Sequence, residues 1–178
     1  MKCKLEIPDS TKKVGMLSFE YCSYSTEITL SKQLETIYCG SFSYCTSLSG
    51  TLIISDSVTE IGTYAFERCD KLTTLTLSKS INFIDHGSFT HCTSMTGSLV
   101  IPESIVKISS NAFEICTSFT SIVFNDKTAR SLSTLQINSN ALNGCSGLTS
   151  KSFSNHIDYI GNDAFSECPY LKGSLVIP

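Results

Sequence analysis

The sequence predicts a solenoid of about seven stacked coils, each 23 or 24 residues long, with short parallel strands along its length. Three observations predict this fold. Seven cysteines recur at intervals of 23, 24, 23, 24, 29 and 23 residues, each has the same apolar neighbourhood, and each repeat contains one short alternating stretch. A fixed period in this range is typical of repeat proteins, in which a coil buries its apolar side chains only against its neighbours.

The recurring cysteines define the columns of the repeat, and they are Cys22, Cys45, Cys69, Cys92, Cys116, Cys145 and Cys168. The residue three positions earlier is aromatic in every coil but one, at Phe19, Phe42, Phe66, Phe89, Phe113, Leu142 and Phe165. The residue four positions earlier is Ser or Ala, and the residue eight positions earlier is Val or Ile, in all seven coils. We expect these columns to form continuous ladders along the stack.

Each coil is expected to contain one half-buried strand. Stretches such as Leu75-Thr76-Leu77 and Leu99-Val100-Ile101 alternate with the period of two that is typical of such strands. Pro or Ser follows the stretch and ends the strand, because it removes or diverts a backbone donor. The hexapeptide Gly-Ser-Leu-Val-Ile-Pro, which occurs at 97–102 and 173–178, is therefore the strand and stop of one coil.

The columns predict a single domain over residues 1–178. They place the coils at residues 4–25, 26–48, 49–72, 73–95, 96–119, 120–148 and 149–171, with a trailing strand at 172–178. The interval of 29 is a normal coil with six added residues in an insertion at 125–131, which is expected to form a surface loop. Gly50, Gly97 and Gly173 are one-residue insertions just before a strand, where glycine can take up the extra bend.

Composition argues against several function classes. The chain has 178 residues, of which 41% are hydrophobic, and a formal net charge of −3. Its thirteen Lys and Arg residues are scattered, whereas phosphate binding depends on clustered positive charge, so no nucleic-acid partner is expected. No stretch of about 18 apolar residues encodes a membrane span. The first five residues lack the apolar core of a secretion signal.

The ladder cysteines are expected to be reduced, buried thiols. Free cysteine is among the most buried residue types, and stacked equivalents point the same way rather than at each other. Disulfides between adjacent coils are the alternative, because stacking brings the Cα atoms near bonding range. Cys3 and Cys39 lie off the ladder, and Cys3 is expected to be the exposed thiol.

No motif for catalysis or metal binding is present in the sequence. Neither Cys-x-x-Cys, His-Glu-x-x-His nor Gly-x-Ser-x-Gly occurs. The three histidines, His86, His91 and His156, fall at unrelated repeat offsets, so stacking is not expected to bring all three together. We therefore expect no metal site, no cofactor and no enzymatic activity.

One repeat supports a family resemblance. Residues 102–120, PESIVKISSNAFEICTSFT, with the preceding LVI, resemble the leucine-rich repeats of the BspA-like family, the Treponema-type repeats on surfaces of oral bacteria and mucosal protozoan parasites. The resemblance extends from Leu5 to Pro178. It implies a curved, right-handed leucine-rich-repeat solenoid, with a parallel sheet on the concave face and short strands or helical turns on the convex face. It also implies a cell-surface or secreted adhesin that binds host matrix proteins or other cells.

Some positions depart from the family pattern. Thr11 and Ser25 weaken the first coil, Thr134 and Leu142 mark the coil after the insertion, and Lys151 replaces the Leu or Ile of its strand. These departures put the regularity of the coils in doubt near residues 125–155.

The solvent face of the strands is the candidate binding surface. Its central column comprises Thr29, Ile53, Thr76, Val100, Val123 and Ser152. The structural interpretation is that these β-forming residues simply suit a pleated surface. The functional interpretation is a shallow, uncharged groove that binds a protein, such as a host extracellular matrix or cell-surface protein, because contiguous exposed apolar surface usually has a use. The alternative function is a structural spacer or stalk that presents other domains and has no ligand of its own.

Both ends of the sequence read as strands, Leu5-Glu6-Ile7 and 175–178, without the polar capping coil that solenoids normally need. This pattern is expected for an excerpt from a longer array. The open last edge predicts end-to-end self-association through residues 171–178.

Overall fold

The computed structural model describes residues 3–125, 134–152 and 157–172. These residues form fourteen strands and no helix. The longer strands are β1 (Cys3–Glu6), β3 (Ser25–Thr29), β5 (Ser49–Ile53), β7 (Lys71–Thr76), β9 (Gly97–Ile101), β11 (Phe119–Phe124) and β13 (Ser150–Ser152). The alternate strands are β2 (Lys13–Val14), β4 (Thr36–Ile37), β6 (Glu60–Ile61), β8 (Phe83–Ile84), β10 (Lys107–Ile108), β12 (Leu135–Ile137) and β14 (Ile157–Ile160).

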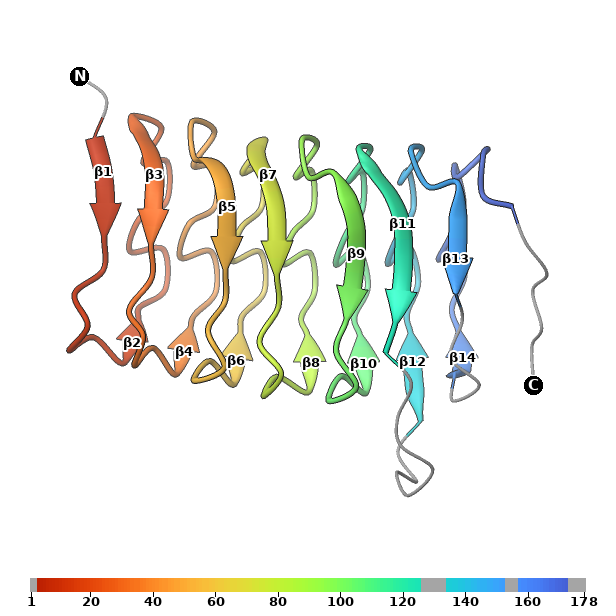
Figure 1. Cartoon of the computed structure of the whole chain (residues 1–178), viewed down its shortest axis with the longest axis horizontal. Helices are drawn as coiled ribbons and strands as arrows, with labels where there is room; N and C mark the ends of the chain where they lie inside the picture. The colour runs from red at the N-terminus through yellow and green to blue at the C-terminus, as the bar shows by residue number, and fades with distance from the viewer. Residues whose placement is uncertain (1–2, 126–133, 153–156, 173–178) are drawn as a thin grey trace.

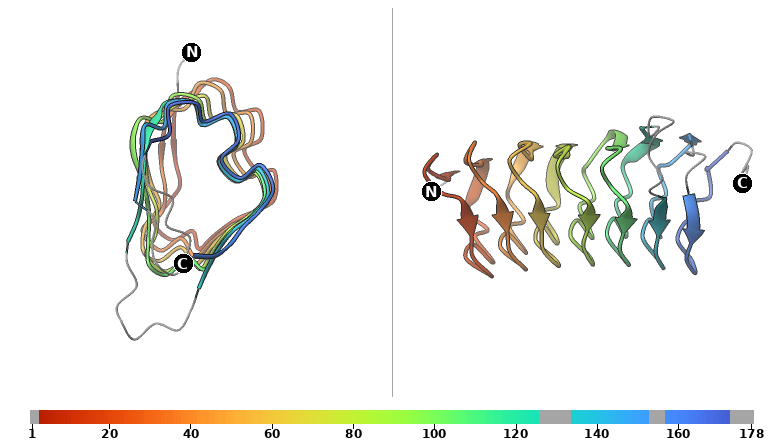
Figure 2. Two further views of the ribbon diagram at one scale, coloured as in Figure 1. Left: turned by 90° about the vertical axis from the view of Figure 1, so that its right-hand side faces the viewer. Right: turned by 90° about the horizontal axis from the view of Figure 1, so that it is seen from below.

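Every coil contributes one strand to each of two sides of the stack. The odd-numbered strands lie side by side on one side and the even-numbered strands on the other, with the two chain ends at opposite ends of the stack (Figure 1). Each paired strand is parallel to its neighbours in the adjacent coils. For example, Ile108 of β10 pairs with Ile84 of β8 on one side and with Ile137 of β12 on the other. Viewed down the stack, successive coils overlie one another around a shared interior (Figure 2). The predicted solenoid is confirmed, and the second side consists of short strands.

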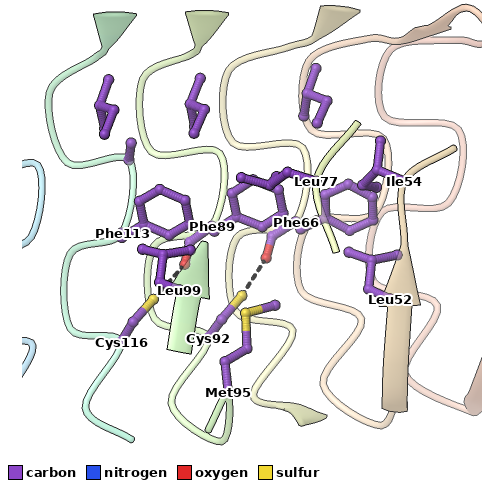
Figure 3. Packing of buried hydrophobic residues seen from close by; sticks show 14 of the residues in the cluster. Leu52, Ile54, Phe66, Leu77, Phe89, Cys92, Met95, Leu99, Phe113 and Cys116 are labelled. Carbon is purple, nitrogen blue, oxygen red and sulfur yellow. Dashed lines mark hydrogen bonds between the residues drawn. The ribbon is translucent and has the colours of Figure 1, made fainter. Parts of the chain in front are cut away.

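A stack of phenylalanine rings runs through the core. Phe42, Phe66 and Phe89 are fully buried, and the centroids of successive rings lie 5.2 and 5.5 Å apart with nearly parallel planes. Figure 3 shows Phe66 and Phe89 together with Phe113. The stack begins with Phe19 and continues to Phe113 at 5.3 Å from Phe89. It stops where Leu142 occupies the column. The predicted ladder of equivalent apolar residues is therefore confirmed.

The ladder thiols are reduced, and each one after Cys22 donates a hydrogen bond to the preceding coil. All nine cysteines are free. The thiol of Cys92 donates to the carbonyl oxygen of Phe66 at 3.2 Å, and that of Cys116 donates to Phe89 at 3.1 Å (Figure 3). The same bond recurs at Cys45, Cys69, Cys145 and Cys168. Stacked thiols therefore bond main chain instead of one another.

Burial raises the pKa of the ladder thiols from Cys45 to Cys168. It raises the pKa of Cys45 to about 11 and that of Cys92 further still, because the anionic thiolate is penalised in an apolar interior. Cys3 is exposed, as the sequence predicts, and its sulfur lies 3.4 Å from the Ser25 hydroxyl oxygen.

The third side of each coil contains turns rather than strands, yet it is bonded as regularly as a sheet. The residues five, three and one before each ladder cysteine donate their N–H groups to carbonyls of the next coil. In the coil of Cys69, the donors Tyr64, Phe66 and Arg68 make bonds of 2.9, 2.8 and 3.0 Å. The same three bonds occur at all six interfaces between coils in the described residues. We call this set the turn ladder.

The first and third donors of the turn ladder have left-handed backbone conformations in all seven coils. Their φ angles are positive, from 52° at Arg68 to 72° at Gly144. The first donors are Leu17, Gly40, Tyr64, Gly87, Asn111 and Asn140, and Asp163 occupies the same position in the last coil. The third donors are Tyr21, Tyr44, Arg68, His91, Ile115 and Gly144, and Glu167 occupies the same position in the last coil. Most of these residues are not glycine, so the repeat imposes a conformation that costs roughly 1–2 kcal/mol per non-glycine residue.

The long-strand side is divided into three ladders, β1 with β3, β5 with β7, and β9 with β11 and β13. Both breaks precede a coil that carries an inserted glycine. Gly50 and Gly97 have φ angles of 82° and 78°, a backbone conformation that glycine adopts without steric cost, which confirms that the inserted residue takes up the extra bend. The extra residue displaces the strand from its predecessor, so the main-chain ladder is interrupted there.

Strand pairing continues through the positions that depart from the family pattern, with a register shift between Leu135 and Gln136 where β12 pairs with β14. Lys151 of β13 pairs with Ile122 of β11, and Gln136 of β12 pairs with Lys107 of β10. Residues 126–133, which hold most of the predicted insertion, lie outside the described residues. So do residues 173–178, on which most of the predicted C-terminal self-association rests. In the described part of the chain, no helix has the length and hydropathy of a membrane span.

Candidate binding surface

The predicted column of site residues lies on the long-strand side, which we call the strand face. Thr29, Ile53, Thr76 and Val100 are exposed, whereas Val123 is half-buried. The exposed fractions of Ile53 and Val100 are 61% and 42%. The side chain of Ser152 lies outside the described residues.

Strand pairing brings these residues together in two groups. Ile53 pairs with Thr76, and Val100 pairs with Val123, which in turn pairs with Ser152. Thr29 pairs with Glu6 in the first ladder. The breaks in the strand face therefore separate Thr29 from Ile53 and Thr76 from Val100.

A second exposed column beside the first carries hydroxyl groups. The Thr74 hydroxyl donates to the Thr51 hydroxyl at 2.7 Å, and the hydroxyls of Ser98 and Ser121 lie 2.7 Å apart. Each hydroxyl has two acceptor lone pairs and one donor, so a pair keeps hydrogen-bonding capacity for a ligand. The two columns from β5 to β11 together present aliphatic groups and hydroxyls without charge.

The break between β3 and β5 opens a hollow of about 260 Å³ on the strand face. Its lining comprises Ile28, Thr29, Leu30, Lys32, Thr51, Leu52, Ile53 and Ser55. Ile28 and Leu30 point inward but remain half-buried, whereas their equivalents Leu52 and Ile54 are buried. The break thus exposes part of the core, and two predicted site residues, Thr29 and Ile53, stand on its two sides.

Reasoning from sequence missed this hollow, although its cause is visible as the glycine inserted at position 50. A strand displaced by one residue cannot maintain the ladder with its unshifted neighbour, and the gap follows. Lys32 is the charged residue in the lining. The nearby carboxylate of Asp9 accepts a hydrogen bond from the main-chain N–H of Lys32 rather than from its ammonium group.

A polar hollow of about 210 Å³ lies on the turn side, lined by Tyr64, Glu67, His86, Thr90, His91, Asn111 and Glu114. Its groups are largely bonded to one another: the Tyr64 hydroxyl lies 2.7 Å from Nε2 of His86, and the Asn111 amide donates to Glu114 at 2.7 Å. His86 and His91, which belong to the same coil, both line this hollow. Among the described residues, no three His, Cys, Asp or Glu side chains are placed to hold a metal ion.

The fold and its ladders define a leucine-rich-repeat solenoid. The sequence matches the BspA type leucine rich repeat region in six copies, over residues 2–119 and 95–178, and the chain belongs to this family. Comparison with curated proteins finds no match to the sequence.

Two solved structures share the fold. The T. pallidum leucine rich repeat protein is 22% identical, with a TM-score of 0.82 over 96% of this chain and 78% of that chain. A leucine-rich repeat protein from Eubacterium ventriosum is 21% identical, with a TM-score of 0.81 over 97% of this chain and 45% of that chain.

Proposed function

We infer that the chain is a protein-binding domain that works in cell-surface adhesion, with the strand face as its contact surface. Leucine-rich repeats generally mediate protein interactions, and their solenoids are typically scaffolds without enzymatic activity. The partner class that fits the family resemblance is a host extracellular matrix or cell-surface protein. The observation that carries the proposal is the hollow beside Ile53, in which the half-buried core residues Ile28 and Leu30 meet a lining whose one charged residue is Lys32.

The chemistry of the strand face supports a partner held by shape rather than by charge. An aliphatic or aromatic side chain of the partner would enter the hollow between Thr29 and Ile53 and cover Ile28 and Leu30. The hydroxyl pairs along β5 to β11 would hydrogen-bond main-chain groups of the same partner. Because the surface has little charge for long-range attraction, we expect binding to depend only weakly on salt.

The test places a charge on the strand face and a matched charge elsewhere. Ile53→Lys and Val100→Lys each put an ammonium group at an exposed apolar position, and we expect a loss of affinity of about tenfold or more, because a desolvated unpaired charge is costly. Phe83→Lys is the control, since Phe83 is 52% exposed on the short-strand side. Binding to immobilised matrix proteins and adhesion to host cells are measured after circular dichroism confirms the fold.

A spacer is the second candidate function. The turn ladder supports it, because its three main-chain bonds are unbroken at all six interfaces and hold the coils in one stack. A spacer predicts that Ile53→Lys, Val100→Lys and Phe83→Lys behave alike in every adhesion assay. Equal adhesion by all three variants contradicts the binding proposal.

A further inference from the structure

The hollow on the turn side lies where small residues of one coil separate larger residues of its neighbours. Gly87 follows Tyr64 in the column of first donors. Thr90 stands between Glu67 and Glu114 in the column two residues before the ladder cysteines. The Tyr64 ring lies against Gly87, where an added Cβ would collide with it, and the ring is 38% exposed and lines the hollow. The hollow therefore lies over the coil of Gly87, with Glu67 on one side and Glu114 on the other.

Both glutamates are half-buried, and each keeps one carboxylate oxygen free of hydrogen bonds to the described residues. Oε2 of Glu67 accepts a bond from the Ser43 hydroxyl at 3.2 Å. Oε2 of Glu114 accepts one from the Asn111 amide at 2.7 Å. In the described part of the chain, neither glutamate belongs to an ion pair, and no Lys or Arg lines the hollow. Two negative charges therefore face the hollow without a cationic partner in it.

We propose that this hollow binds the guanidinium group of an arginine side chain from a partner protein, between Glu67 and Glu114. The two glutamates belong to coils two steps apart, so their Cα atoms lie about 10 Å apart at the usual spacing of paired backbones. A guanidinium presents five N–H donors around a rigid plane, so it can bind a carboxylate on each side at once. An ammonium group is a compact point charge and suits two separated carboxylates less well.

The aromatic ring in the lining also favours arginine. Guanidinium groups pack on aromatic rings more often than ammonium groups do, and Tyr64 offers a partly exposed ring beside the two carboxylates. The chain makes such a contact one coil earlier, where Cζ of Arg68 lies 5.9 Å from the centroid of the Tyr44 ring. This second site lies on the turn side, so it goes beyond the binding function proposed for the strand face.

The first test compares three blocked tripeptides, acetyl-Gly-X-Gly-amide, with arginine, lysine or citrulline at X. Citrulline has nearly the shape of arginine and lacks its charge. We expect the arginine peptide to shift the NMR signals of the His86 and His91 rings, which line the hollow. We expect it to bind about fivefold or more tightly than either other peptide, because only the guanidinium makes charge-assisted bonds to both carboxylates.

The second test removes the carboxylates one at a time. Glu67→Gln and Glu114→Gln should each weaken binding of the arginine peptide by about fivefold or more, because glutamine removes the charge. Its amide oxygen still accepts the bond from Ser43 or Asn111, so the local structure is kept. Glu60→Gln is the matched control, since Glu60 is an exposed glutamate of β6 on the short-strand side, and its affinity should equal that of the unchanged chain.

Three outcomes overturn the proposal. The first is a lysine or citrulline peptide that binds as tightly as the arginine peptide. The second is an affinity that Glu67→Gln and Glu114→Gln leave unchanged, or that Glu60→Gln lowers equally, which indicates general attraction to a negatively charged chain. The third is binding of free arginine without binding of the arginine peptide, which assigns the hollow to an amino acid instead of a protein. Because the strand face takes no part in this site, none of these outcomes bears on the proposed binding function.

Discussion

Replacing Phe89 with alanine removes the ring at the middle of the core stack. Phe89 is fully buried, and the centroid of its ring lies 5.5 Å from that of Phe66 and 5.3 Å from that of Phe113, with the ring planes nearly parallel. Phe→Ala changes in cores lower the free energy of unfolding by about 3–5 kcal/mol. Each ring pair adds about 0.5–1.5 kcal/mol beyond its buried area, so we expect the upper half of that range, about 4–5 kcal/mol.

Phe83→Ala provides the matched control in the same coil. Phe83 is about half exposed, so its replacement by alanine loses less hydrophobic transfer free energy than the replacement of Phe89 and leaves no cavity in the core. We expect its loss to stay below about 1.5 kcal/mol. The assay is urea unfolding followed by far-ultraviolet circular dichroism. A loss for Phe89→Ala no larger than that for Phe83→Ala would refute the view that the ring stack organises the core.

The remaining predictions concern the stack, the turns and the thiols. Phe89→Leu should cost about 1–3 kcal/mol, because two ring pairs are lost while the column keeps an apolar residue, as Leu142 does; urea unfolding measures it. Gly87→Ala should lower the melting temperature more than Gly97→Ala, because both have positive φ but only the Cβ added at Gly87 meets the Tyr64 ring. The contribution of the Cys45 thiol to the free energy of unfolding should be fully present below pH 9.0 and be lost as pH rises to about 11, because burial in the folded state raises the pKa of this thiol; Cys45→Ala should flatten the fall of stability in that range. A thiol reagent should modify Cys3 in the native protein and Cys92 only after unfolding, as mass spectrometry would show; early labelling of Cys92 would contradict the buried ladder.

The core columns were predictable because they depend on side chains. Phe66 and Cys69 recur at fixed offsets, and a column that recurs in every coil must be stacked. The short strands were expected only from the family resemblance, since two-residue strands such as Glu60–Ile61 leave too short a pattern to read.

The backbone features were harder to predict because main-chain bonds leave little trace in composition. Gly40, Gly87 and Asn111 mark the first left-handed column, so that column had a visible signal. The second column includes Arg68 and Ile115, which give none, because the bonds of the turn ladder impose the conformation whatever the side chain. The hollow on the strand face required knowing that Gly50 displaces its strand from β3 as well as bending it.

The turn ladder makes the same three main-chain bonds at every interface between coils, and this affects how such a protein can change in evolution. Since every coil offers its successor the same three N–H groups and is met by the same three carbonyls, the coil of Cys69 would accept the coil of Cys116 as readily as that of Cys92. Duplication or loss of one whole repeat therefore rejoins matching surfaces and leaves no orphaned main-chain groups. Selection can lengthen or shorten the molecule in 23-residue steps while the chemistry of each junction stays constant.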